Sequence, residues 1–234
     1  MAAPLFFAGH ISSNDIIPLD EENSRHIVQV LRMKSGETIW LTDGRGHRVK
    51  AAISEAHKKH CTARPLSSSF TPRREPPLTI GISLVKNAAR FEWFLEKATE
   101  LGTAAIIPLI CDRTEKQRAR RDRLESICRS AMLQSGQSWM PEVHEPAAFR
   151  DVVRQSAPQQ KLFGHITAGA RKLALALNPG AASHLVLIGP EGDFTDEESA
   201  LALASGFEGV SFGETILRVE TAGLFAATVH AALT

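Results

Sequence analysis

Residues 184–206 read HLVLIGPEGDFTDEESALALASG, and this stretch decides the fold of the C-terminal part of the chain. The apolar run His184–Ile188 predicts a short, fully buried strand. Gly189-Pro190-Glu191-Gly192 follows directly, and a helix is predicted a few residues later. Thr195 and Glu198 have the spacing of a capping box, in which each side chain accepts a hydrogen bond from the other residue's backbone N–H. A buried strand, a tight turn and a capped helix make one β–α unit.

The same alternation of strands and helices continues from residue 78 to residue 234. The expected strands are 78–85, 104–110, 161–166, 184–189 and 209–213, and the expected helices are about 89–102, 121–136, 149–154, 171–177, 196–205 and 219–232. In the helix at 89–102, the residues at helical spacing that are predicted to face the core are Phe91, Phe94, Leu95 and Ala98. Repeated β–α units predict an α/β fold with a mostly parallel sheet that helices cover on both faces.

Residues 1–70 have the pattern of a small β-rich module. Strands are predicted at 37–43 and 45–56, since the Asp43-Gly44-Arg45-Gly46 turn between them is a strong hairpin signal. The serine- and proline-rich stretch 67–77 follows neither periodicity, so a linker is expected there. The sequence is therefore divided into a β-rich domain at 1–70, a linker at 71–77 and an α/β domain at 78–234.

Composition limits the functions of the chain. Its 43% hydrophobic and 23% charged residues are ordinary for a globular protein, and no run of 18 apolar residues suggests a membrane span. The N-terminus lacks the basic segment of a signal peptide, and the three cysteines, Cys61, Cys111 and Cys128, are far apart. These features predict a reduced, cytoplasmic protein without a disulfide framework or a membrane partner.

The net charge of +1 conceals an uneven distribution. Lys and Arg outnumber Asp and Glu by 11 to 8 in residues 1–75 and by 7 to 3 in residues 113–129. Residues 185–234 hold 8 acidic residues and one basic residue, Arg218. A basic front part suggests that it binds a polyanion. The alternative is that the run RARRDR, 118–123, is only the solvated face of a helix.

Two unusual loops are predicted at the carboxyl ends of strands, where open α/β sheets bind ligands. One is IGPEGDF, 188–194, whose glycines let the backbone approach a ligand closely. The other is SFGETILRVETAG, 211–223, whose mixture of polar and apolar side chains suits a ligand with a polar and an apolar part. The sequence has neither common phosphate-binding motif, and Glu191 would repel a pyrophosphate, which disfavours NAD, FAD and ATP.

The pair IGPEGDF…E and FGETILRVETA resembles the signature of the SPOUT methyltransferases, and more closely that of the ribosomal RNA small subunit methyltransferase E family. The likeness runs nearly end to end and also includes Ser24–Gly36, Asp43–Gly46, Lys86, Glu96–Gly102, Pro108, Arg113, Gln134-Ser135 and Pro141. Asp193 stands where the family usually has Gly, which adds charge and bulk to the loop. Gln137 stands where the family usually has Arg, which removes one contact to RNA or substrate.

The resemblance implies a PUA-like β-barrel domain that binds RNA, followed by an α/β-knot domain whose C-terminus forms a trefoil knot. It also implies S-adenosylmethionine as the cofactor, methylation of N3 of a uridine in 16S rRNA of the small ribosomal subunit, and a homodimer. Transferred to this chain, the cofactor-binding residues are Phe163, Leu187, Gly189, Pro190, Glu191, Gly192, Phe212, Gly213, Ile216, Leu217, Arg218, Thr221 and Ala222.

When N3 of uridine loses its proton, negative charge develops on the base, and a nearby cation stabilises it. Arg218 is the candidate cation because it is the only Lys or Arg after residue 185. Glu191 or Glu220 is the candidate base, or the group that holds Arg218 and the cofactor. The alternative is a purely structural salt bridge between Arg218 and Glu220. RNA phosphate contacts are expected at Arg25, Arg32, Lys34, Arg45, Arg113 and Arg129.

Other interpretations stay open at this point. His57-Lys-Lys-His60-Cys61 offers three possible metal ligands but no evident fourth, so no metal site is expected. An enzyme of the same fold could methylate another RNA, such as transfer RNA or large-subunit rRNA, because no residue pattern specifies the base. The remaining class is a non-catalytic RNA-binding assembly factor, and the intact IGPEG and ETILRVETA loops argue against it.

Overall fold

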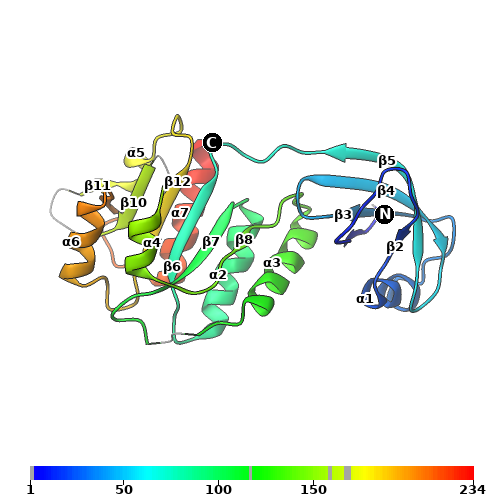
Figure 1. The fold of residues 1–234 in the computed structure, drawn as a ribbon, viewed down its shortest axis with the longest axis horizontal. Coiled ribbons are helices and arrows are strands. Elements are labelled where there is room, and N and C mark those ends of the chain that lie inside the picture. Colours follow the sequence, from blue (N-terminus) through cyan, green and yellow to red (C-terminus); the bar gives the residue numbers. More distant parts are fainter. Residues whose placement is uncertain (1–2, 116–117, 158–159, 166–169) are drawn as a thin grey trace. The chain divides into compact units, whose positions relative to one another are not determined.

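The computed structural model describes residues 3–115, 118–157, 160–165 and 170–234 (Figure 1). The chain forms two compact units. Unit 1 comprises Met1–Arg73 and Met132–Met140, and unit 2 comprises Arg74–Ala131 and Pro141–Thr234. The division at 1–70, 71–77 and 78–234 stays a prediction, and it places Met132–Met140 in the α/β domain.

Unit 1 is built on a five-stranded sheet with the order β1-β3-β4-β5-β2. Its strands are β1 (Leu5–Phe7), β2 (Ile17–Pro18), β3 (Thr38–Thr42), β4 (His47–Glu55) and β5 (Thr62–Phe70). The predicted hairpin is confirmed, because β3 and β4 pair antiparallel with Leu41 opposite Val49. A short helix, α1 (Glu21–Arg25), continues as a π-helical turn, His26–Val30, and its Ile27 lies in the buried core of this sheet.

The serine-rich stretch of unit 1 differs from the expectation for it. Ser67, Ser68 and Ser69 belong to β5 and pair with β4, so the expectation that the linker begins at Ser67 is wrong. Their side chains are exposed, as is that of Phe70. This end of β5 has no buried side chain, so its sequence shows no apolar alternation, and its place in the sheet depends on backbone pairing with β4.

Unit 2 contains an eight-stranded sheet in which every described pair of strands is parallel, which confirms the predicted α/β class. The strands are β6 (Leu78–Ser83), β7 (Ala105–Ile110), β8 (Glu142–Val143), β9 (Ala147–Ala148), β10 (Gln160–Gly164), β11 (Arg171–Lys172), β12 (His184–Ile188) and β13 (Glu208–Ser211). Their order is β11-β13-β10-β12-β6-β7-β8, with β9 also paired to β7. All five side chains of β12 are buried, as its apolar sequence predicts. The trefoil knot stays a prediction.

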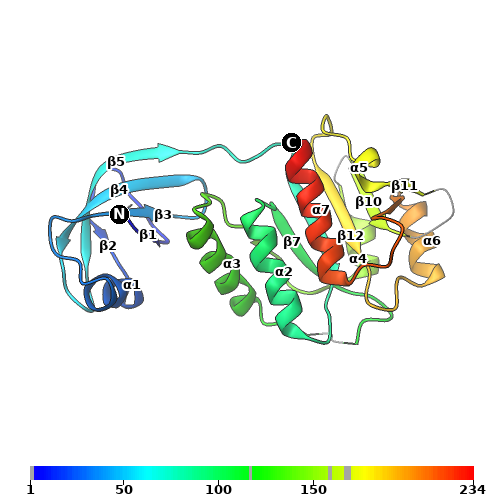
Figure 2. The ribbon, with the colours of Figure 1, turned by 180° about the vertical axis from the view of Figure 1, so that it is seen from behind.

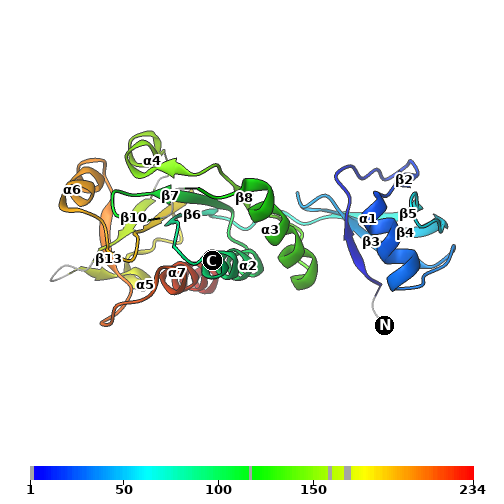
Figure 3. The same cartoon turned by 90° about the horizontal axis from the view of Figure 1, so that it is seen from below.

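Helices cover both faces of this sheet (Figure 3). They are α2 (Ala88–Glu100), α3 (Arg121–Ser135), α4 (Phe149–Gln155), α5 (Leu173–Ala176), α6 (Asp196–Ala204) and α7 (Val219–Leu233). The α4 and α6 helices lie on one face, and α2 and α7 lie side by side on the other (Figure 2). The helix expected at 171–177 is shorter than predicted, because Arg171–Lys172 forms β11 and only Leu173–Ala176 is helical.

The packing of α7 on α2 and the sheet depends on a glycine. The residues of α2 that were predicted to face the core are all buried: Phe91, Phe94, Leu95 and Ala98. A Cβ added to Gly223 of α7 would lie 2.6 Å from the Phe94 ring and 2.8 Å from the Ile82 side chain. Since a densely packed interior leaves no space for that atom, glycine permits this close approach. The packing holds the start of α7 at the carboxyl edge of the sheet.

Candidate active site

A cavity of about 460 Å³ lies in unit 2 at the carboxyl ends of β10, β12 and β13. Two loops form most of its wall: the β12–α6 loop, 189–195, and the β13–α7 loop, 212–218. The lining residues are Gly164, His165, Ile188, Gly189, Pro190, Glu191, Gly192, Asp193, Val210, Phe212, Gly213, Thr215, Ile216, Leu217, Arg218, Val219 and Ala222. The cavity has the volume and position of a small-ligand site in an α/β protein.

A turn closes the β12–α6 loop. The Asp193 N–H donates to the Pro190 carbonyl at 2.9 Å, and Asp193 has a φ of 63°. This left-handed conformation suits Gly, and Asp adopts it more readily than most residues. The Asp193 carboxylate also accepts the Phe194 N–H at 2.8 Å, which offsets part of the strain. The departure from the usual family glycine therefore occurs where the backbone demands a positive φ.

Glu198 joins this loop to the loop that follows β7. The predicted capping box is confirmed: Oε2 of Glu198 accepts the Thr195 N–H at 2.9 Å, and the Thr195 hydroxyl accepts the Glu198 N–H at 3.2 Å. The second carboxylate oxygen, Oε1, accepts the N–H of Asp112 at 2.9 Å. Glu198 is only 1% exposed. A buried carboxylate that accepts two backbone hydrogen bonds holds both loops in one arrangement.

Arg113 makes a second connection between the same two loops. Its Nη1 donates to the Gly192 carbonyl at 2.6 Å. The side chain also packs on Gly192, where an added Cβ would lie 3.3 Å from Arg113 Cδ. The sequence predicts Arg113 as an RNA contact. Its guanidinium supports the cavity wall in this structure, and the RNA contact stays a prediction.

The β13–α7 loop has fewer contacts. The Ser211 hydroxyl donates to the Gly213 carbonyl at 2.8 Å. The Phe212 ring packs on Gly164, where an added Cβ would lie 2.6 Å from a ring carbon. Ile216 lines the cavity and is nevertheless 87% exposed. A ligand that covered this apolar side chain would remove it from water, which is favourable.

The structure separates two residues that the sequence analysis treats together. Arg218 lines the cavity and is exposed, and its guanidinium has no polar partner among the described residues. Glu220 is only 8% exposed and does not line the cavity; its carboxylate lies 3.7 Å from the Arg90 guanidinium. The alternative of an Arg218–Glu220 salt bridge is therefore wrong for the described residues. Glu191, in contrast, is exposed on the cavity wall.

Most of the predicted cofactor-binding residues lie together around this cavity. Those that line it are Gly189, Pro190, Glu191, Gly192, Phe212, Gly213, Ile216, Leu217, Arg218 and Ala222. Phe163 and Leu187 lie in the hydrophobic core instead, and Thr221 is exposed on α7 outside the lining. Successive residues of a strand point to opposite faces of the sheet, so neighbours at a strand end can belong to the core and to the cavity wall. A match of sequence motifs does not distinguish the two.

Some lining residues are not among the predicted cofactor-binding residues. They are Gly164, His165, Ile188, Asp193, Val210, Thr215 and Val219. Their position in the sequence could have identified them, because each lies at a strand end or inside one of the two motif loops. His165 stacks on Phe163, and its Nδ1 is buried without a hydrogen-bond partner among the described residues. A buried polar atom of this kind usually has a partner, so it suits a polar ligand.

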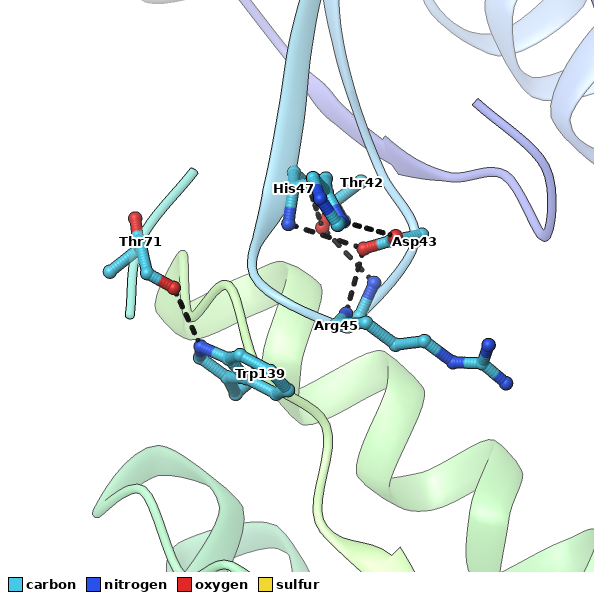
Figure 4. Close-up of polar contacts among 7 residues, drawn as sticks. Thr42, Asp43, Arg45, His47, Thr71 and Trp139 are labelled. Atoms are coloured by element: carbon cyan, nitrogen blue, oxygen red, sulfur yellow. Dashed lines mark hydrogen bonds and ion pairs between the residues drawn. The ribbon is translucent and has the colours of Figure 1, made fainter. Parts of the chain in front are cut away.

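In unit 1, the predicted RNA contact Arg45 extends from the β3–β4 turn (Figure 4). The Asp43 carboxylate accepts the Arg45 N–H at 2.7 Å and lies 2.8 Å from Nδ1 of His47. Trp139 forms a backbone bridge with Arg45, and its indole N–H donates to the Thr71 carbonyl at 2.8 Å. These bonds hold the turn, whereas the Arg45 guanidinium points away from them and is exposed (Figure 4).

The other predicted RNA contacts are also on the surface. Arg25 lies in α1, 3.8 Å from the Glu21 carboxylate. Arg32 and Lys34 follow the π-helical turn, and Arg32 has a φ of 55°. Arg129 is exposed on α3. Exposure satisfies the first requirement for a phosphate contact.

The buried cysteine thiols of unit 2 lie outside this cavity. Burial raises the pKa of the Cys111 thiol to about 12 and that of the Cys128 thiol to about 11, so both stay protonated near neutral pH. Within the described part of the chain, no group of three or more His, Cys, Asp or Glu side chains is arranged to hold a metal ion. None of the described helices has the length and apolar character needed to cross a membrane.

Two family models match the chain. The model described as an RNA methyltransferase domain matches residues 73–231, and the model described as an RNA methyltransferase PUA domain matches residues 19–66. The ribosomal RNA small subunit methyltransferase E of Synechocystis sp. is 31% identical over 213 residues, which cover 88% of this chain and 69% of the relative. The Bacillus subtilis protein of the same name is 27% identical over 221 residues, 88% of this chain and 85% of the relative.

Solved structures extend the likeness over nearly the whole chain. A ribosomal RNA small subunit methyltransferase E from Neisseria gonorrhoeae bound to S-adenosyl methionine has a TM-score of 0.90 at 30% identity, covering 99% of this chain and 98% of that chain. A probable rRNA-methyltransferase from Porphyromonas gingivalis has a TM-score of 0.89 at 34% identity and covers 98% of both chains. A putative methyltransferase from Legionella pneumophila in complex with SAM has a TM-score of 0.88 at 29% identity, covering 99% of this chain and 98% of that chain.

Proposed function

This chain belongs to the ribosomal RNA small subunit methyltransferase E family, and we propose that it transfers a methyl group from S-adenosylmethionine to N3 of a uridine in 16S rRNA. The substrate would be the small ribosomal subunit or its RNA, in the cytoplasm. One observation carries the proposal: the two motif loops on which the family resemblance rests meet as the walls of one cavity.

The lining of the cavity fits S-adenosylmethionine. Phe212, Ile216 and Leu217 supply apolar surface for the adenine and the thioether part. Glu191 and Asp193 place carboxylates at a wall that would face a positively charged sulfonium. When bound, the cofactor supplies an electrophilic methyl group on that sulfur. The residues of the chain orient the cofactor and the base, which is mainly a matter of positioning.

Arg218 would stabilise the negative charge that develops on uracil as N3 loses its proton. It lies on the cavity wall with an exposed guanidinium, and no described carboxylate neutralises it. A fixed cation at the place where charge develops lowers the barrier to the reaction. Arg218 also occupies the N-cap position of α7, so the packing of α7 determines where its backbone lies.

Glu191 is better placed than Glu220 to accept the N3 proton or to hold the cofactor. Glu191 is exposed on the cavity wall, whereas Glu220 is buried beside Arg90. We assign Glu220 a positioning role instead. Its ion pair with Arg90 joins the first turns of α7 and α2, two residues after Arg218 in the sequence.

Unit 1 would hold the RNA through phosphate contacts at Arg25, Arg32, Lys34 and Arg45. The exposed Phe70 ring and the Trp139 ring lie beside the β3–β4 turn, with ring centroids 6.2 Å apart. Aromatic rings next to exposed arginines suit single-stranded RNA, whose bases stack on such rings. A target N3 lies on the pairing edge of uridine, so the base must be unpaired when it reacts.

The protein would act as a homodimer through the face formed by α2 and α7. Trp93 of α2 is 43% exposed, and Leu233 of α7 is 41% exposed. Large apolar residues exposed on two adjacent helices suit a symmetric contact with a second copy. Sedimentation equilibrium is expected to give a dimer for the wild type and a monomer for Trp93→Glu. A monomeric wild type at all concentrations would exclude this assembly.

The reaction is tested by transfer of labelled methyl from S-adenosylmethionine to small subunits that lack native modification. Wild type and Arg218→Ala are compared, and the RNA is digested to nucleosides. Label in 3-methyluridine with the wild type is the expected result. Label in another nucleoside, or only in transfer RNA or large-subunit rRNA, would replace the proposed substrate. Absence of both methyl transfer and saturable S-adenosylhomocysteine binding would favour a non-catalytic RNA-binding factor.

A further inference from the structure

A second cavity of about 230 Å³ lies in unit 2 after the carboxyl end of β6. It is formed between the first turns of α2 and the residues at the start of α3. The lining residues are Leu84, Val85, Ala88, Phe91, Glu92, Arg118, Ala119, Arg120, Arg123 and Leu124. None of them lines the larger cavity.

The floor and the rim of this second cavity differ in chemistry. The floor consists of side chains that are at most 4% exposed: Leu84, Val85, Phe91 and Leu124. Three arginines and one glutamate belong to the rim. Arg123 donates from Nε and Nη2 to the two Glu92 carboxylate oxygens, each at 2.8 Å, which neutralises that pair. Positive charge therefore remains at Arg118, and Arg120 is paired with Asp122 outside the lining.

Arg120 contacts Asp122 at 2.6 Å, and both side chains are largely exposed, at 81% and 68%. The pair has two hydrogen bonds, from Nε at 3.3 Å and from Nη2 at 2.6 Å, and its exposure lets a phosphate compete with the carboxylate for the guanidinium. An apolar floor below a cationic rim suits a ligand with a flat apolar part and an anionic part. A nucleotide has this combination, with the base on the floor and the phosphate at the rim.

The position of the second cavity relates it to the proposed reaction. β6 is the direct neighbour of β12, and both cavities lie at the carboxyl edge of the same sheet. The Arg90–Glu220 ion pair lies between them: Arg90 is in the first turn of α2 with Ala88, and Glu220 is two residues after Arg218. A strand of RNA that runs along this edge of the sheet would pass both cavities.

We propose that the cavity between α2 and α3 binds a nucleotide of the substrate RNA next to the target uridine. The base enters over Phe91 and Leu124, and its phosphate contacts Arg118 and Arg120. This inference rests on the proposed RNA methylation. It adds a second binding site that holds the strand in register while the target base reacts.

The test fills the cavity and compares it with a matched control. Ala88 and Ala89 are both exposed in the first turn of α2, but only Ala88 lines the cavity. Fluorescent decauridylate is titrated into full-length wild type, Ala88→Trp and Ala89→Trp. Stacking of one base contributes on the order of 1–3 kcal/mol, so Ala88→Trp is expected to weaken binding about tenfold. Ala89→Trp is expected to bind as the wild type does.

A charge-reversal pair gives an independent measurement that does not depend on how well the tryptophan variant folds. Arg120→Glu is expected to weaken decauridylate binding and to make it less dependent on salt, because one phosphate contact is lost. Arg154→Glu is the control, since Arg154 is exposed in the last turn of α4, on the other face of the sheet. Its affinity for decauridylate is expected to match that of the wild type.

Equal affinities within both pairs of variants would overturn the inference. The inference would also be overturned if Ala88→Trp were a monomer in sedimentation while the other variants stayed dimers. The cavity would then belong to a contact with a second copy. S-adenosylhomocysteine affinity is measured in parallel and is expected to be unchanged in all four variants. If the wild type transfers no methyl group while the difference in decauridylate binding persists, the proposed reaction fails and the binding site stands.

Discussion

The β12–α6 loop and the β13–α7 loop line the same cavity, but different kinds of contact hold them. The first is tied by Glu198, by Arg113 and by the turn between Pro190 and Asp193. The second contains Ile216, 87% exposed, and ends at Arg218, whose guanidinium has no described polar partner. Contacts that span distant parts of the fold therefore hold the first wall, whereas the second wall has only local bonds and the packing of Phe212 on Gly164. The β12–α6 loop, 189–195, is called the tied wall below, and the β13–α7 loop, 212–218, is called the free wall. Arg218, the proposed reactive cation, belongs to the free wall.

The largest expected effect is that of a substitution at Arg218 in the free wall, which tests the difference between the two walls. Arg218→Ala is expected to lower kcat for methyl transfer by about 100- to 1000-fold, since removal of a group that stabilises developing charge has effects of this size. The free energy of unfolding is expected to stay within about 0.5 kcal/mol, because exposed substitutions usually have small effects. Single-turnover kinetics and urea unfolding measure the two quantities. Wild-type kcat in Arg218→Ala would show that the cation acts elsewhere.

The protein is expected to be less stable in acid because of a buried histidine in α7, the helix that follows the free wall. His230 of α7 bonds to the Pro76 carbonyl at 3.0 Å, and burial, followed by His184, lowers its pKa to about 4. The unfolded histidine titrates near its ordinary pKa of about 6.5, so the unfolded state takes up the proton first. The contribution of His230 to the free energy of unfolding is therefore complete above pH 6.5 and falls by about 3 kcal/mol as the pH approaches 4.

Urea unfolding of the wild type and His230→Gln at pH 7.5 and pH 4.5 measures this effect. Glutamine can still donate a hydrogen bond but does not titrate, so the variant is expected to lose less stability between the two values. Burial lowers the pKa of His184 as well, and this group contributes part of the loss in both proteins. Equal losses in the two proteins would show that His230 is not the responsible group.

The next effect concerns the tied wall. Glu198→Ala leaves the Asp112 and Thr195 N–H groups without their acceptor, and each of these part-buried groups then costs about 1 kcal/mol. We expect destabilisation of about 2 kcal/mol together with weaker S-adenosylhomocysteine binding. Thr195→Ala removes only the cap and is expected to cost about 1 kcal/mol. Calorimetric titration and urea unfolding check both. If the two variants have equal affinity for the ligand, the bond to Asp112 does not position the loop.

A smaller effect is expected at Ile216, and it tests whether a ligand covers the exposed part of the free wall. Ile216→Ala is expected to leave the free energy of unfolding unchanged but to weaken S-adenosylhomocysteine binding by about 1 kcal/mol. The substitution removes three side-chain carbons that the bound ligand would partly cover. Leu175→Ala is the matched control, since Leu175 is 72% exposed and does not line the cavity. Equal binding by both variants would show that the ligand does not cover Ile216.

The smallest effect is expected at Asp193. Asp193→Gly relieves a positive φ but loses the bond to the Phe194 N–H and adds freedom to the unfolded chain, so these contributions nearly cancel. The net change in unfolding free energy is expected to be within about 0.5 kcal/mol. Asp193→Ala keeps the strain without the bond and is expected to be less stable by about 1 kcal/mol. Thermal unfolding of the three proteins gives the comparison, and an Ala variant as stable as the Gly variant would contradict it.

Local sequence patterns determined most of the secondary structure and the composition of the two loops. Thr195 and Glu198 could be identified as a capping box because the bonds span three residues of one helix start. The buried strand His184–Ile188 and the inward face of α2 follow from apolar periodicity. The two motif loops carried the family assignment, because their residues are contiguous in the chain.

Only the tertiary structure decided which groups meet across the sheet. The Asp112 N–H donates a hydrogen bond to the Glu198 carboxylate, 86 positions away in the sequence. Glu220 pairs with Arg90 and not with its near neighbour Arg218. Ser67–Ser69 join a strand through backbone bonds that do not depend on side-chain type. These contacts depend on how parallel strands and helices pack, and packing is a property of the assembled core that no short stretch of sequence contains.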